Sequence, residues 1–218
     1  MSLELYFHPL SSFCQKVLVA FYENGTPFEG HVVDLGDETQ RTNFRKLWPI
    51  GKFPVLRDTS AGLTIPESSV IIEYLDQHYP GLTRFLPQDP DAARQARFRD
   101  RFYDLYVQLP MQKIVIDRLR PPGQGDSLGV EQALGQLATA LDIIEKDMGA
   151  KTWAMGEAFT MAECAAAPAL YYANLVMPFE ASHKNVSAYY ARLMARPSFA
   201  RAVAEAAPYR AQFPDQTA

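Results

Sequence analysis

The sequence predicts two units, an α/β unit followed by an all-helical one. The chain has 218 residues, enough for two compact domains of about 100 residues each. Its first 80 residues switch repeatedly between apolar alternation of period two and helical periods, a pattern typical of mixed α/β units. From Asp91 onward we find only helical periods, which predicts that the second unit is all helical.

The first unit has the predicted order β-α-β-α-β-β-α. Its first strand runs from Leu3 and ends at Pro9, and its first helix begins near Phe13 and stops at Asn24-Gly25. The remaining expected elements are a strand over 28–34, a short helix over 40–47, a strand pair over 53–57 and 63–66, and a helix over 68–79.

Tyr79-Pro80-Gly81, followed by further prolines, breaks this pattern and marks a linker. We therefore expect domains at 1–80 and 91–218, joined by a linker at 81–90. The second domain is expected to contain helices over 92–118, 128–148, 161–175, 186–195 and 199–206. Thr160 to Glu163 has the form of a capping box, which predicts a buried helix start with Cys164 in the core.

Composition argues against several classes of function. A net charge of -4 and a pI near 5.6 give the chain no electrostatic reason to bind nucleic acid or an anionic membrane. Cys14 and Cys164 stand alone, without metal-ligand or disulfide-framework spacing, so we expect no metal site and a cytoplasmic location. No apolar run approaches the roughly 18 residues of a membrane span.

The turn between the first strand and the first helix is the first group of residues that could carry chemistry. A helix N-terminus has unpaired N–H groups and a partial positive charge, which favour a nearby thiolate. Ser11 and Cys14 have the spacing of a CxxC redox motif with a hydroxyl in place of the first sulfur. Such a hydroxyl cannot attack a disulfide, but it can donate a hydrogen bond to a sulfur on a ligand. Ser11 and Ser12 as plain helix caps are the alternative.

Lys52-Phe53-Pro54 is the second group. A proline that opens a regular strand is unusual unless its peptide bond or its missing N–H matters. If Phe53-Pro54 is cis, the backbone of Phe53 turns outward and can pair with an extended peptide. Lys52 would then stand beside it as a partner for a carboxylate. An ordinary loop before an edge strand is the alternative.

Glu67-Ser68, at the start of the last helix of the first unit, is the third group. The Ser68 hydroxyl and amide can bind a carboxylate, and Glu67 can hold an ammonium group. Together they can grip the head group of an amino acid. Helix capping alone is the alternative here too.

These three stretches, in this order and spacing, resemble the glutathione transferase family. The resembling sequences are S-S-F-C-Q-K-V, G-K-F-P-V-L, P-E-S-S-V-I-I-E-Y-L and G-E-A-F-T-M-A-E, which together cover nearly the whole chain. The first stretch looks most like the serine-type classes, particularly tau and zeta. The resemblance implies a thioredoxin-like N-terminal domain, an all-helical C-terminal domain, a homodimer and glutathione as co-substrate.

The resemblance also implies roles for individual residues. Ser11 would be the catalytic hydroxyl, with Ser12 as the next choice; Phe53 would pair its backbone with the cysteinyl part of glutathione. Glu67 and Ser68 would hold the γ-glutamyl end, and Lys52 would face the glycyl carboxylate. A free thiol has a pKa of ~8.5, and hydrogen bonding plus the helix terminus would lower it so that the thiolate attacks a small hydrophobic electrophile.

Other readings remain open at this stage. The zeta resemblance suggests a maleylacetoacetate isomerase, although Phe13 and Cys14 depart from its S-S-C-S pattern. Cys14 could form a mixed disulfide with glutathione in a thiol-disulfide oxidoreductase. A non-catalytic glutathione-binding protein of the same fold is the third alternative. For the second substrate, Tyr103, Tyr106 and Met111 are candidate walls, although aromatic residues at helical spacing also fit a core.

Overall fold

The computed structural model describes residues 2–179 and 181–214. Its first part contains β1 (Leu3–Phe7), α1 (Ser12–Asn24), β2 (Glu29–Val32), α2 (Glu38–Leu47), β3 (Val55–Asp58), β4 (Leu63–Pro66) and α3 (Ser68–His78). The predicted order is thereby confirmed. The second strand is shorter than predicted, and α2 begins earlier because Asp37 caps it, accepting a hydrogen bond from Gln40 N at 2.8 Å.

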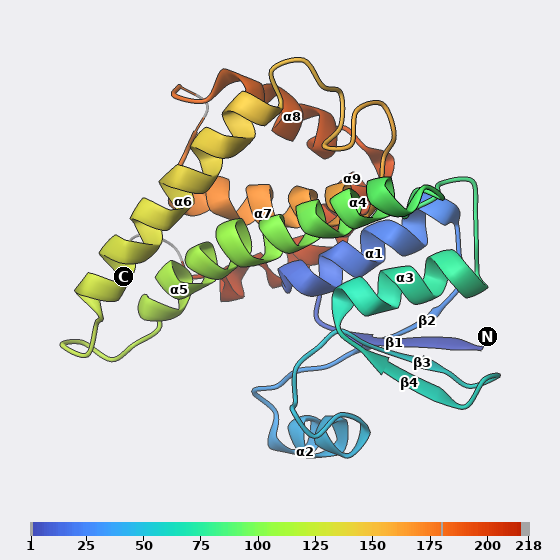
Figure 1. The fold of residues 1–218 in the computed structure, drawn as a ribbon. Helices are drawn as coiled ribbons and strands as arrows, with labels where there is room; N and C mark the ends of the chain where they lie inside the picture. The colour runs from blue at the N-terminus through green and yellow to red at the C-terminus, as the bar shows by residue number, and fades with distance from the viewer. Residues whose placement is uncertain (1, 180, 215–218) are drawn as a thin grey trace.

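The four strands form one mixed sheet in the order β2-β1-β3-β4. β1 runs parallel to β2 and antiparallel to β3, and β3 pairs antiparallel with β4. Leu3, Leu5 and Phe7 alternate along β1 with less buried residues, as expected for a strand with one fully covered face. In Figure 1, α1 and α3 cover one face of the sheet and α2 lies on the other.

The second part is all helical, as predicted. It contains α4 (Pro90–Phe102), the π-helical η1 (Tyr103–Gln108), α5 (Leu109–Asp117), α6 (Ser127–Asp147), α7 (Met161–Val176), α8 (Lys184–Met194), α9 (Pro197–Ala206) and the 3₁₀ helix η2 (Ala207–Gln212). The predicted capping box of α7 is present, with Thr160 N donating to Glu163 Oε2 at 2.8 Å, and Cys164 is fully buried.

The prediction of one regular helix over 92–118 is wrong in its middle. α4, η1 and α5 follow one another as a continuous helical rod, which is π-helical between α4 and α5. There Leu109 N–H donates to Asp104 O, five residues back. Pro110 supplies the physical reason. It has no N–H to donate to the carbonyl of Tyr106, and its ring would clash with that carbonyl in a regular α-helix. A wider turn just before the proline avoids both problems.

α1 is the central helix of the molecule. It contacts α3 on the sheet side and α7 and α9 on the helical side, so a single apolar core runs through both parts. Figure 1 shows α1 between the sheet and the helical layer. Because the first turn of α1 is fixed by this packing, the β1–α1 connection is held in place from both sides.

Two properties of residues 2–179 and 181–214 bear on the possible kinds of site. Every helix there is too short or too polar to cross a bilayer. The His, Cys, Asp and Glu side chains of these residues do not gather in groups of three or more that could hold a metal ion.

Candidate functional site

One cavity of about 410 Å³ brings together the six residues that the sequence assigned to glutathione binding and thiol activation. It is lined by the β1–α1 turn, the α2–β3 loop, the start of α3 and the rod from α4 to α5. The six residues are Ser11, Lys52, Phe53, Pro54, Glu67 and Ser68. Such a volume is typical of small-molecule sites.

Ser11 stands at the N-cap of α1. Its Oγ accepts a hydrogen bond from Cys14 N at 3.3 Å, and its own N–H donates to His8 O at 3.0 Å. A hydroxyl that accepts a bond still has its proton to donate, so Ser11 Oγ–H can serve a ligand in the cavity. The turn is tied to the helical part because Tyr172 OH donates to Leu10 O at 2.7 Å.

Cys14 and Ser12 are placed differently. Cys14 is fully buried, and burial raises the pKa of its thiol to about 12 despite the hydrogen bond to Ser11. A thiol in such surroundings is a poor nucleophile. Ser12 is only 7% exposed and lines a separate small cavity beside Lys16 and Gln108. Among these three side chains, Ser11 alone lines the 410 Å³ cavity.

The α2–β3 loop brings Lys52, Phe53 and Pro54 to the rim of the cavity. The Phe53-Pro54 peptide bond is cis, the condition on which the expected exposure of the Phe53 backbone depended. The paired sheet residues begin only at Val55, which has partners on both sides, Tyr6 and Pro66. Phe53 and Pro54 therefore lie just outside the ladder, with Lys52 exposed beside them.

Glu67 has a strained backbone at the start of α3. Its φ is 72° and its ψ is 117°, and it is the single non-glycine residue with positive φ among those described. Such conformations cost about 1–3 kcal/mol and gather at functional sites. Within the described residues no side chain caps this helix end, so the first-turn amides of α3 lack a side-chain acceptor next to the cavity that Glu67 and the buried Ser68 line.

The opposite wall differs from the one expected. Tyr103 and Met111 are 2% and 3% exposed and belong to the helical core, and Tyr106 is exposed but does not line the cavity. The rod instead presents Leu105 and Leu109, with further lining from Arg101, Asp104, Gln112, Phe13, Leu35, Trp48 and Gly51. Arg101, Leu105 and Leu109 stand four residues apart along this rod, so they form one face, and that face is not the one that carries the three expected residues.

A buried ion cluster lies behind this wall. Lys16 Nζ is 2.6 Å from Asp100 Oδ1 and 2.8 Å from Asp104 Oδ2, and it donates to Ser69 Oγ at 2.9 Å. Burial alone would lower the pKa of Lys16, but the two carboxylates raise it above its ordinary value. The cluster connects α1, α3, α4 and η1. Sequence reasoning missed it, because no local pattern signals ion pairs between residues so far apart.

Comparison with known proteins decides the family. The family model for the N-terminal domain of glutathione S-transferases matches residues 5–83, and the one for the C-terminal domain matches residues 127–192. Glutathione S-transferase 3 of Zea mays is 31% identical over 211 residues, which cover 93% of each chain. The chain belongs to the glutathione S-transferase family.

Other members of the glutathione S-transferase family agree in sequence and in fold. The glutathione S-transferase-like protein LUC7 of a Fusarium species is 32% identical over 165 residues, which cover 72% of this chain and 71% of that protein. A crystal structure of a glutathione S-transferase from Methylobacillus flagellatus, described with glutathione bound, superimposes with a TM-score of 0.85 at 28% identity, covering 92% of this chain and 98% of that one.

The charges around the cavity of this glutathione S-transferase family member are mixed. Lys52 and Arg101 contribute positive charge, and Glu67 and Asp104 contribute negative charge. Arg101 Nη1 lies 3.1 Å from Asp104 Oδ2, so these two partly neutralise each other at the edge of the ion cluster. The rim of the cavity therefore carries charged groups of both signs.

Proposed function

We propose that this protein binds glutathione in the 410 Å³ cavity and transfers it to a small hydrophobic electrophile. The observation that carries the proposal is the position of the Ser11 hydroxyl, at the N-terminus of α1 and on the wall of the cavity that also contains the five other predicted residues. Glutathione is an extended tripeptide with an amino acid head group, a thiol and a second carboxylate. The three groups of residues complement these three parts.

The proposed mechanism begins with the thiol. Ser11 Oγ–H donates a hydrogen bond to the sulfur, and the α1 terminus favours its negative charge, so the thiol pKa falls below ~8.5 and the thiol proton is released to water. The thiolate electron pair then attacks the electrophilic carbon and forms a C–S bond. The displaced pair leaves with a halide, or stays on the oxygen of an opened epoxide, which takes up a proton from water.

The binding roles follow the same geometry. The Phe53 backbone pairs with the cysteinyl part, Glu67 holds the ammonium group and the Ser68 amide the carboxylate of the γ-glutamyl end, and Lys52 faces the glycyl carboxylate. The electrophile lies against the apolar part of the opposite wall, where Leu105 and Leu109 line the cavity.

Replacing Ser11 by alanine tests the proposal. The bound thiol should lose its hydrogen bond, its pKa should rise toward that of free glutathione, and kcat should fall about a hundredfold, as when one oxyanion donor is removed. The pKa is read from thiolate absorbance during a pH titration of the complex, and kcat from conjugation of an aryl halide. Ser12→Ala is the matched control and should change neither. Unaltered values in Ser11→Ala would disprove the assignment.

Binding and activity assays distinguish the alternative functions. Retention on a glutathione column without conjugation of aryl halides or epoxides would indicate a binding protein, and turnover of maleylacetoacetate would indicate the isomerase. A thiol-disulfide oxidoreductase would lose its activity in Cys14→Ser and keep it in Ser11→Ala. The full burial and raised pKa of Cys14 argue against this last function.

We also propose a homodimer and a cytoplasmic location. Phe98, Phe102 and Tyr106 contact one another along α4 and η1, and Phe98 and Tyr106 are 51% and 44% exposed. An exposed aromatic strip of this kind favours a protein interface. Phe98→Lys should therefore halve the mass measured by sedimentation at micromolar concentration, whereas a monomeric wild type would contradict the dimer. The free, buried Cys14 and Cys164 support the cytoplasmic location.

A further inference from the structure

The β1–α1 connection Pro9–Ser11, which ends in the proposed catalytic hydroxyl, is held by side chains from two helices. Pro9 O accepts a hydrogen bond from Gln15 Nε2 of α1 at 2.8 Å, and Leu10 O accepts one from Tyr172 OH of α7 at 2.7 Å. The two side chains also contact each other, since Gln15 Nε2 donates to Tyr172 OH at 3.2 Å. The tyrosine oxygen therefore donates one hydrogen bond and accepts another, which fixes its position.

The other backbone groups of this connection have partners as well. Leu10 N–H donates to His8 Nδ1 at 3.3 Å, and Ser11 N–H donates to His8 O at 3.0 Å. Ser11 O accepts from Gln15 N at 2.8 Å, and the proline has no N–H to satisfy. Every backbone donor and acceptor of the connection is thus bonded, so the connection has little freedom to move.

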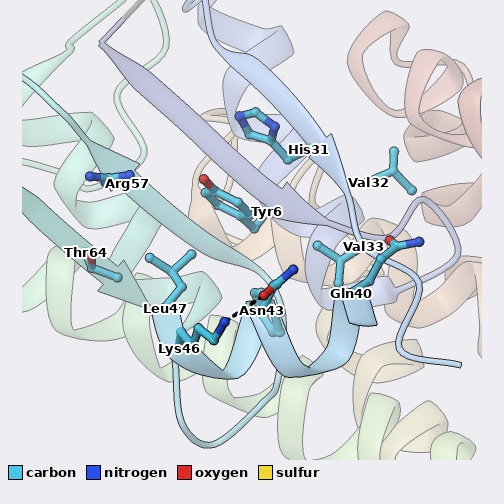
Figure 2. A pocket seen from close by; sticks show the side chains of 11 residues that line it. Tyr6, His31, Val32, Val33, Gln40, Asn43, Lys46, Leu47, Arg57 and Thr64 are labelled. Carbon is cyan, nitrogen blue, oxygen red and sulfur yellow. Dashed lines mark hydrogen bonds between the residues drawn. The ribbon is translucent and has the colours of Figure 1, made fainter. Parts of the chain in front are cut away.

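The sheet face toward α2 gives this connection no hydrogen bond. A groove of about 650 Å³ lies there, with Tyr6 and Arg57 among the residues that line it (Figure 2). Within the described residues, no hydrogen bond joins a residue that lines this groove to the connection. The side chains that hold the connection therefore come from His8, α1 and α7.

Tyr172 holds the peptide group directly before Ser11. The carbonyl carbon of Leu10 is bonded to Ser11 N, and the peptide group is planar, so its O and its N–H turn together. Tyr172 OH binds the O of this group, and His8 O binds the N–H at its opposite end. Without the tyrosine hydroxyl, the plane would be free to rotate, and the side chain of Ser11 that lines the cavity would move with it.

Tyr172 is itself fixed in place. Its ring stacks on Phe213, with the centroids 5.4 Å apart and the planes 28° from parallel, and it meets the ring of Tyr171 edge-on at 5.0 Å. Burial raises the pKa of the Tyr172 hydroxyl, so the hydroxyl stays protonated and remains a donor to Leu10 O. The connection is therefore held by a rigid group.

Gln15 stands where an apolar side chain would pack better. It is fully buried on α1, as are Cys14, Val17 and Leu18, which are apolar. Gln15 Oε1 has no hydrogen-bond partner within the described residues. A buried acceptor without a partner lowers the stability of a protein. The amide is therefore better explained by the two hydrogen bonds of its Nε2, to Pro9 O and Tyr172 OH, than by packing.

We propose that Tyr172, supported by Gln15, is a positioning residue for the Ser11 hydroxyl, so that one hydroxyl on α7 determines how well the bound thiol is activated. The inference rests on the proposed function, because it takes Ser11 as the donor to the sulfur. Tyr172 does not line the 410 Å³ cavity. Its removal should therefore change the chemical step and leave glutathione binding nearly intact.

Tyr172→Phe tests the inference, because it removes the hydroxyl and keeps the ring. We expect kcat for conjugation of an aryl halide to fall about tenfold, the effect of one hydrogen bond. KM for glutathione should change less than about twofold. The pKa of the bound thiol, read from thiolate absorbance, should rise. Gln15→Met keeps the bond from Tyr172 to Leu10 O and should lower kcat less than Tyr172→Phe does.

A double-mutant cycle links the effect to Ser11. In the Ser11→Ala background, Tyr172→Phe should change neither kcat nor the thiol pKa any further, because no hydroxyl is left to position. Gln15→Met is carried through the same cycle, so the test stands even where Tyr172→Phe does not fold.

Tyr189→Phe is the matched control. It removes another fully buried tyrosine hydroxyl, which donates to Glu163 Oε1 at 3.0 Å and does not bond the connection. This variant should lower the melting temperature as Tyr172→Phe does, and it should leave kcat and the thiol pKa as in the wild type. A general loss of stability is thereby separated from a displaced Ser11.

Amide hydrogen exchange measures the support of the connection without glutathione. Exchange of the Ser11 amide, which donates to His8 O, should be about tenfold faster in Tyr172→Phe and unchanged in Tyr189→Phe. Wild-type exchange in Tyr172→Phe would show that the hydroxyl does not hold the connection.

Three kinetic outcomes would also overturn the inference alone. They are wild-type kcat and thiol pKa in Tyr172→Phe, an equal loss in Tyr189→Phe, and a loss from Tyr172→Phe that is as large in the Ser11→Ala background as in the wild type. Wild-type kcat and thiol pKa in Ser11→Ala itself would instead refute the proposed function, and the inference with it.

Discussion

At the scale of single residues, Glu67 should lower the stability of the protein through its backbone and strengthen glutathione binding through its carboxylate. Its positive φ is a conformation that glycine adopts without strain. Glu67→Gly should therefore raise the free energy of unfolding by up to about 1 kcal/mol, and it should weaken glutathione binding because the carboxylate is lost. Urea unfolding and calorimetric titration with glutathione measure the two effects.

Glu67→Gln is the control for this exchange. It retains the strained backbone but removes the charge, so it should weaken binding without the gain in stability. If Glu67→Gly and Glu67→Gln were equally stable, the φ of 72° would not be a source of strain.

The six cavity-lining residues could be singled out from the sequence because each belongs to a local pattern. Ser11 and Ser68 are recognisable from the helix starts that they precede or open, and Pro54 from its unusual place before a strand. Arg101 and Leu105 were missed, since nothing local tells which face of a long helix meets a cavity. Their i, i+4 spacing, shared with Leu109, was the available signal.

At the scale of elements, Asp58 connects the β3–β4 turn to α3. Its carboxylate accepts hydrogen bonds from Ser60 Oγ at 2.6 Å, Tyr74 OH at 2.8 Å and Tyr79 OH at 2.5 Å. Burial alone would raise the pKa of Asp58, but these hydroxyls and the Ala61 amide hold it well below its usual range. The hairpin and the end of α3 therefore depend on one charged group.

The pH dependence follows from this lowered pKa. Stabilisation by Asp58 is fully present above the unfolded pKa of about 3.9 and is lost as the pH falls through the lower folded value. Asp58→Asn should be less stable at pH 7 by about 1–3 kcal/mol, and its stability should fall less steeply below about pH 4. Urea unfolding at several pH values measures this. Asp91→Asn, at an exposed position, should behave as the wild type.

The order of elements was predictable from periodicity, whereas the π-helical turn was not. Averaging over 92–118 gives a helical period whether or not one turn is wider. Pro110 was the only local signal, and a proline in a helix also indicates a simple kink. The predicted second strand, 28–34, was longer than β2 for a similar reason. Phe28 and Asp34 continue the sequence pattern from which the strand was predicted, but they lie outside β2.

At the scale of the whole molecule, Lys16 connects the sheet part with the helical part. Lys16→Met would leave Asp100 and Asp104 buried without their ammonium partner, so it should destabilise the protein by about 3–5 kcal/mol. Urea unfolding at neutral pH measures the change.

Two further variants control this prediction. Adding Asp100→Asn and Asp104→Asn to Lys16→Met removes all three charges and should restore most of the stability. Lys151→Met breaks a partly exposed pair with Asp147 and should cost less than about 1 kcal/mol. A Lys16→Met protein as stable as Lys151→Met would show that the cluster contributes little.

The continuous core predicts that both parts unfold together. Trp48 lies in the first part and Trp153 in the second, and the chain has no other tryptophan. Trp48→Phe and Trp153→Phe each leave one fluorescent reporter. After correction for the effect of each substitution on stability, the two fluorescence midpoints should equal each other and the midpoint for the loss of helical circular dichroism. Two separate transitions would show that the parts are independent.

The sequence predicted both parts but not their shared core, because the contacts of α1 with α7 and α9 span most of the chain.

The wide turn before Pro110 also makes the acceptor side of the cavity sensitive to chain length. Shortening the segment Tyr103–Gln108 by one residue would return it to the ordinary helical pitch and rotate every later side chain of the rod by about 100°. Leu109 and Gln112 would then leave the cavity, and Met111 and Ile114 would leave the core, while Ser11 and Glu67 would stay in place. Under the proposed function, one deleted codon would thus alter the fit of the electrophile while Ser11 still faced the thiol, at a cost in stability.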